Sequence, residues 1–124
     1  MRRSLIGLVA LAVFAATLLV APAALAKDGD VRVAGTCSAS STSKLELSRE
    51  DGGVEVEFEV DQNREGVRWQ VVLLRNGSRV ASRSAVTRGP SGSFEARFVT
   101  SGAGRFAARA HRTGERCSAR ASLW

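Results

Sequence analysis

The single histidine of the chain, His111, is the first residue to consider for catalysis, because Ser–His–acid chemistry needs an oriented imidazole base. His111 directly follows Ala110, an apolar position of an alternating segment, so we expect the imidazole to point to solvent. The chain has no tyrosine and lacks the Gly-x-Ser-x-Gly stretch that positions a nucleophile in many hydrolases. We therefore predict that the protein is not an enzyme and has no catalytic residue.

The chain has two cysteines, Cys37 and Cys117, which are the next residues to consider for their chemistry. In an exported protein an even pair of this kind predicts a disulfide. The bridge closes a loop of about 80 residues, for which the chain-entropy model gives about 4.5 kcal/mol of stabilisation. With both cysteines bridged and one histidine left, too few ligands remain for zinc. We predict no bound metal or cofactor, with a weak surface calcium ion along the acidic strand as the open alternative.

Charged residues alternate with apolar ones along several segments, which predicts two outer surfaces of opposite charge. One is acidic, with Glu46, Glu55, Glu57, Glu59, Asp61 and Glu95 partly balanced by Lys44 and Arg97. The other is basic and carries Arg68, Arg105, Arg109, Arg116 and Arg120. We expect the basic surface to dock an anionic partner such as a wall polymer, lipid headgroups or an acidic protein. The alternative is that these charges serve solubility alone.

The first 26 residues have the three-part layout of a cleavable export signal. Arg2 and Arg3 precede an apolar run over residues 5–20, and Ala24-Leu25-Ala26 supplies a small-residue cleavage site. A transmembrane anchor is the alternative, because about 20 apolar residues span a bilayer. Pro22 and the cleavage site favour processing after Ala26, which predicts a secreted protein with no transmembrane segment. The export route, general or twin-arginine, stays open.

Removal of this leader leaves 16 basic and 12 acidic residues, a net charge of +4. Nucleic-acid binding without sequence preference needs exposed aromatic residues beside clustered positive charge. Most aromatic residues here fall on apolar, inward positions of the alternating pattern. We therefore expect no nucleic-acid partner.

Period-two alternation runs through residues 31–123, with turn-forming residues between the segments. Asn76-Gly77 predicts a tight hairpin, because this turn needs positive φ at both central residues. We expect an all-β fold: one seven-stranded antiparallel sandwich over residues 43–124, with an N-terminal segment, 27–42, tied to the last strand through Cys37. The expected strands are 43–50, 54–61, 67–75, 78–87, 93–100, 104–112 and 115–123.

This layout resembles small exported domains of the immunoglobulin-like and fibronectin-type-III-like class. The resemblance lies in Trp69 on the third strand, the Asn76-Gly77 hairpin and Thr113-Gly114-Glu115 leading into Cys117. The second and sixth strands carry no cysteine, unlike antibody domains, so the resemblance gives no support to an antibody-like receptor role. It implies a sandwich fold over the whole exported segment and assigns no activity.

We therefore expect a secreted, non-enzymatic binding module, a monomer, which docks an anionic cell-envelope polymer or an extracellular protein. The alternative is a small exported protease inhibitor or carrier that uses a protruding loop. Residues 88–91 are its best candidate, because Arg88 is polar and Pro90 stiffens the loop.

Overall fold

A computed structural model describes residues 30–124, and the predicted leader with its cleavage site after Ala26 lies outside this range. Within this range no helix is long and apolar enough to cross a membrane. Nine strands make up the described chain: β1 (Val31–Ala34), β2 (Thr36–Cys37), β3 (Thr42–Glu50), β4 (Gly53–Asp61), β5 (Arg68–Arg75), β6 (Ser78–Val86), β7 (Ser93–Thr100), β8 (Gly104–Arg112) and β9 (Glu115–Leu123).

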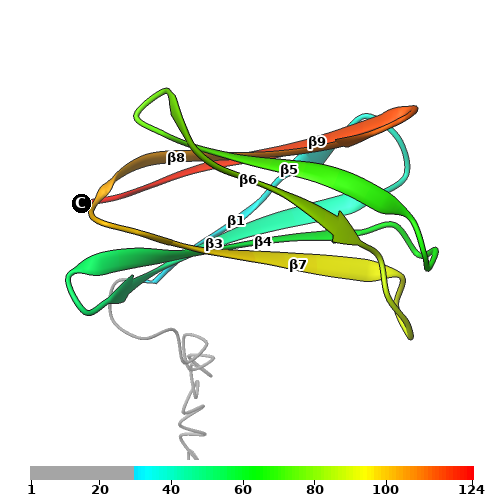
Figure 1. The fold of residues 1–124 in the computed structure, drawn as a ribbon, viewed down its shortest axis with the longest axis horizontal. Helices are drawn as coiled ribbons and strands as arrows, with labels where there is room; N and C mark the ends of the chain where they lie inside the picture. The colour runs from blue at the N-terminus through cyan, green and yellow to red at the C-terminus, as the bar shows by residue number, and fades with distance from the viewer. Residues whose placement is uncertain (1–29) are drawn as a thin grey trace, which may run out of the picture.

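The strands form two antiparallel sheets that lie one above the other (Figure 1). One sheet has four strands in the order β1-β3-β4-β7, and the other has five in the order β2-β9-β8-β5-β6. Alternate side chains of both sheets point inward and form one apolar core, in which Trp69, Phe58 and Phe106 are the largest fully buried side chains. The remaining side chains of each strand form the two outer faces.

Strands β3 to β9 agree with the seven predicted strands to within one residue at each end. The predicted total of seven is wrong, because residues 31–37 add two short strands. Val33 of β1 lies opposite Leu45 in the four-stranded sheet, whereas β2 pairs with β9 in the other sheet. The N-terminal segment is therefore shared between both sheets and is not attached to the last strand alone.

Gly35 lies between β1 and β2, where the chain passes from one sheet to the other. Its amide donates a hydrogen bond to the Ser43 carbonyl at 2.8 Å. A Cβ atom at this position would meet the Ser43 hydroxyl and the Ser118 carbonyl oxygen, so a larger residue would push the chain away. This close approach explains why the segment changes sheets at a glycine.

The predicted disulfide between Cys37 and Cys117 is confirmed. The two residues lie directly opposite each other in the β2–β9 pairing, with Cα atoms 4.0 Å apart and a sequence separation of 80. The bridge therefore lies within the five-stranded sheet and fixes its short edge strand. A disulfide of this kind fits an oxidising compartment.

Candidate functional site: an arginine-rich sheet face

The five-stranded sheet carries an unusual balance of charge, with nine arginines and one carboxylate in its strands. The carboxylate belongs to Glu115, which is 3% exposed and lies on the inward side of β9. The outer side of this sheet therefore has no acidic residue of its own to neutralise arginine.

Six of the nine arginines point outward, and we call the surface that they define the arginine face. All six are exposed, and within residues 30–124 none of their guanidinium groups has a hydrogen bond or ion pair. Half-buried Val72, Leu74 and Ala107 form the apolar centre of this face. The six are Arg68 on β5, Arg79 on β6, Arg105 and Arg109 on β8, and Arg116 and Arg120 on β9.

The other three arginines of the sheet contact the protein. Arg75 donates to the Ala103 carbonyl at 3.1 Å, and Arg83 donates to the Arg97 carbonyl at 2.6 Å. Arg83 also lies 4.5 Å from the centre of the Phe98 ring, and Arg112 lies 5.4 Å from the Trp69 ring. These three side chains lie at the ends and at the open edge of the sandwich, and their guanidinium groups bind other parts of the fold.

On the outer side of the four-stranded sheet, which we call the acidic face, three basic residues pair with carboxylates of the same face. Arg97 lies 3.0 Å from Glu55 and 2.7 Å from Glu57, which are neighbours on β4. Arg32 pairs with Glu46 at 3.2 Å, and Lys44 pairs with Glu59 at 3.4 Å. Each basic residue of these pairs thus lies beside a carboxylate of an adjacent strand.

Glu57 is the most perturbed carboxylate of the acidic face. Partial burial, a hydrogen bond to Glu55 and the charge of Glu95 raise the pKa of Glu57 to about 7, against the opposing effect of Arg97. The charges of Glu57 and Glu55 in turn raise the pKa of Arg97. One arginine therefore does not fully offset three neighbouring carboxylates.

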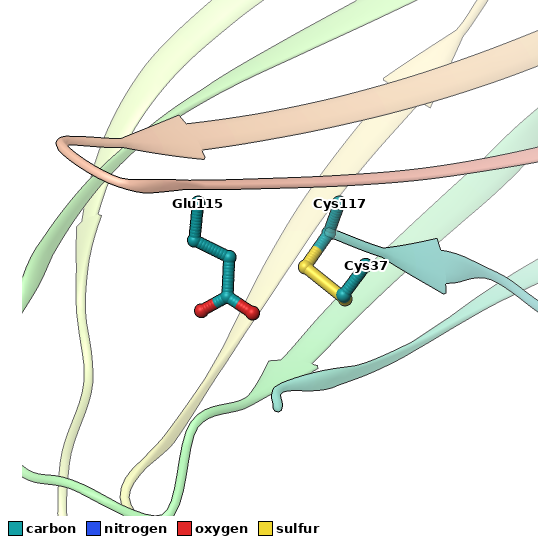
Figure 2. Close-up of side chains that lie close together, drawn as sticks. All are labelled: Cys37, Glu115 and Cys117. Carbon is teal, nitrogen blue, oxygen red and sulfur yellow. A yellow bond between two sulfur atoms is a disulfide. The ribbon is translucent and has the colours of Figure 1, made fainter. Parts of the chain in front are cut away.

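Glu115 and the disulfide form a second cluster, at the inner side of β9 (Figure 2). Ser41 donates its amide to Glu115 at 3.0 Å and its hydroxyl at 2.6 Å. Burial alone would raise the pKa of Glu115, but these hydrogen bonds and the nearby Arg112 hold it below its ordinary value. The two sulfurs are bonded to each other, so the cluster offers one free ligand and does not fit a metal ion.

Arg88 and Pro90, the predicted loop contacts, lie in the turn between β6 and β7. Both are exposed, but the turn is closed by hydrogen bonds between Arg88 and Ser93 in both directions. The Gly92 carbonyl also accepts a hydrogen bond from the Gln62 amide of the neighbouring loop. The turn is thus compact and joined to the rest of the fold, and its role as an inhibitory loop stays a prediction.

The structure brings all five predicted surface arginines, Arg68, Arg105, Arg109, Arg116 and Arg120, onto one face. Their function in binding is not tested by this placement. Sequence reasoning missed Arg79, because a bulge near Val80 shifts the alternation of β6. It also treated Glu115 as a turn residue, although Glu115 shares the odd-numbered, inward row of Cys117 and Ala119.

No protein-family model, characterised protein or solved structure matches this chain.

Proposed function

We propose that the protein acts outside the cytoplasm as a non-catalytic binding module whose arginine face docks an anionic polymer of the cell envelope. The single observation that carries this proposal is the outward placement of six arginines on a sheet whose one carboxylate is buried. Arginine forms paired hydrogen bonds with phosphate and carboxylate groups, so a surface of free guanidinium groups is well suited to a polyanion.

Electrostatics favours the same partner. Like charges close together on a surface repel, and an anionic partner relieves this repulsion while it releases its own counterions. The acidic face does not attract a polyanion, because its basic residues already have carboxylate partners. Binding is therefore expected through one face and with a strong dependence on salt.

Two features support a site of action outside the cytoplasm. The first 26 residues have the composition of an export signal. The Cys37–Cys117 bridge persists in oxidising compartments and is uncommon in the cytosol.

We also propose an immunoglobulin-like or fibronectin-type-III-like class for the sandwich. In support, the long strands β3, β4 and β7 share one sheet, and β5, β6, β8 and β9 share the other. Trp69 lies buried on β5, the third of the long strands. This class alone carries no activity, so the function rests on the arginine face.

The test is binding of the purified, oxidised protein to isolated cell walls. The face variant is Arg116→Gln/Arg120→Gln, and the control is Arg49→Gln/Arg64→Gln, which removes the same charge from exposed arginines outside the face. We expect the face variant to lose about 10-fold or more in affinity and the control to change less than about 2-fold. Equal losses in both variants, or none in either, would overturn the proposal.

A further inference from the structure

Two neighbouring hollows on the arginine face share one arginine. The first, of about 630 Å³, is lined by Arg109, His111 and Arg116 together with Thr36, Ser38 and Ser118. The second, of about 460 Å³, is lined by Arg105, Arg109 and Arg120 over Leu74 and Ala107. Three basic side chains thus line each hollow, and Arg109 belongs to both.

Strand pairing places these basic side chains at regular steps along β8 and β9. His111 lies opposite Arg116, and the next outward pairs are Arg109 with Ser118, Ala107 with Arg120 and Arg105 with Ser122. Outward residues two apart on a strand are separated by about 7 Å. Each successive pair therefore presents at least one basic side chain, alternating between the strands.

We propose, resting on the function proposed above, that these two hollows hold successive phosphates of a linear phosphodiester polymer that runs along β8 and β9. Three backbone bonds of an extended chain span about 3.3–3.6 Å. A repeat of six bonds, such as a phosphodiester joined through a three-carbon polyol, therefore spans about 7 Å. This repeat matches the spacing of the basic side chains.

The polar groups beside Arg109 favour phosphate over carboxylate. Ser118 lies opposite Arg109 on β9, and Thr36 of β2 lies opposite Ser118. Neither hydroxyl has a hydrogen-bond partner within residues 30–124. The two oxygens of a carboxylate lie in one plane, whereas the oxygens of a phosphodiester are arranged tetrahedrally and can accept from a guanidinium group and from hydroxyl donors in different directions.

The shape of the face favours a single linear chain over a lipid surface. The large exposed apolar residues of the described chain are Val80, Val99 and Trp124. They lie at the bulge of β6, on the opposite sheet and after the end of β9, and none of them lines either hollow, so the hollows offer no large exposed apolar side chain for insertion among acyl chains.

The experiment compares three probes by titration: poly(glycerol phosphate) of about 10 repeats, polyglutamate of equal charge and phosphatidylglycerol vesicles. Arg109→Gln is the test variant, and Arg68→Gln and Arg79→Gln are controls, because both controls remove the same charge from the same face outside the two hollows. An unchanged thermal midpoint establishes that each variant is folded.

We expect Arg109→Gln to weaken poly(glycerol phosphate) binding about 10-fold or more and each control to weaken it less than about 3-fold. Ser118→Ala should weaken binding of poly(glycerol phosphate) and leave polyglutamate binding unchanged. Equal losses in Arg109→Gln and the controls would overturn the shared subsite but leave the arginine face as the docking surface.

Other outcomes bear on the ligand. Polyglutamate binding as tight as poly(glycerol phosphate) binding would overturn the phosphodiester assignment, and tighter vesicle binding would overturn the linear chain. If neither Arg109→Gln nor Arg116→Gln/Arg120→Gln changes binding to any probe or to cell walls, the proposed function itself fails.

Discussion

The two outer faces of this sandwich are built from similar strands but use their charges differently. On the acidic face Arg97, Arg32 and Lys44 each lie within 3.4 Å of a carboxylate on a neighbouring strand. On the arginine face no side chain neutralises a guanidinium group within residues 30–124. The basic side chains are therefore paired within the fold on the acidic face and left for a partner on the arginine face.

The arginines of the five-stranded sheet show the same contrast. Arg75, Arg83 and Arg112 donate to backbone carbonyl oxygens, and Arg83 and Arg112 also lie over aromatic rings. The outward arginines have no such contacts. Residue type alone does not reveal a binding surface; the side of the strand on which the residue lies decides whether its charge is available.

The largest expected effect comes from removing the bridge that fixes one edge of the arginine-bearing sheet. Cys37→Ala/Cys117→Ala should lower the free energy of unfolding by about 2–5 kcal/mol, because the unfolded chain regains the freedom of a long loop. Denaturant unfolding measures this change. The amide exchange rate should rise in β2 and stay low in β3 and β4. An equal rise in both sheets would contradict a local effect of the bridge on the five-stranded sheet.

The next largest effect is expected at Glu115, which is the one carboxylate in the strands of the arginine-bearing sheet. Glu115→Ala leaves the buried Ser41 donors and Arg112 without their partner, and should cost about 2–4 kcal/mol in denaturant unfolding. Glu59→Ala is the control, because the Glu59 side chain is partly exposed on the acidic face. It should lower the free energy of unfolding by less than about 1 kcal/mol. Equal costs would contradict the distinction between buried and solvent-screened carboxylates.

The variant Arg97→Gln tests whether the two faces have different roles. Arg97→Gln leaves Glu55, Glu57 and Glu95 without their shared cation, so the thermal midpoint should fall by about 2–5 °C. Polyanion binding should not weaken. Arg109→Gln should show the reverse, with an unchanged midpoint and weaker binding. If Arg97→Gln weakened binding as much as Arg109→Gln, the contrast between the faces would fail.

The smallest effect is a pH dependence from the acidic face. The pKa of Glu57 is raised from 4.5 to about 7, so the folded state binds this proton more tightly than the unfolded state. Stability from this group is therefore present below pH 4.5 and lost as pH rises through about 7. Its contribution should be under about 1 kcal/mol, because the side chain is 26% exposed.

The variant Glu57→Gln tests this dependence, with Glu59→Gln as the matched control on the same strand. The plot of unfolding free energy against pH between pH 5 and 8 should be flatter in Glu57→Gln and should keep its slope in the control. Glu115 acts in the opposite direction at lower pH: its pKa is lowered from 4.5, so its stabilisation is lost on further acidification. A wild-type protein that becomes more stable from pH 5 to 8 would contradict the assignment to Glu57.

Strand alternation was enough to predict β3 to β9 and five of the six residues of the arginine face. It was not enough for Arg79 and Arg83, which are four residues apart and would share a side of a regular strand. The bulge that skips Val80 places Arg79 outward and Arg83 inward. No turn residue marks this bulge, so counting along the sequence could not locate it.

The N-terminal segment and Glu115 show two further limits of the sequence. β1 and β2 have four and two residues, too few for alternation to identify two strands or the change of sheet at Gly35. Glu115 follows a glycine turn, which hid its place in the inward row. In both cases the deciding contact, with Ser43 or Ser41, comes from another strand or loop.

The most direct measurement is a titration of the ¹⁵N-labelled protein with poly(glycerol phosphate), followed through the Nε–Hε signals of the arginines. Signals of Arg105, Arg109, Arg116 and Arg120 should shift and broaden, and those of Arg83 and Arg97 should stay in place. Shifts at Arg97 without shifts on the outer side of β8 and β9 would contradict the account.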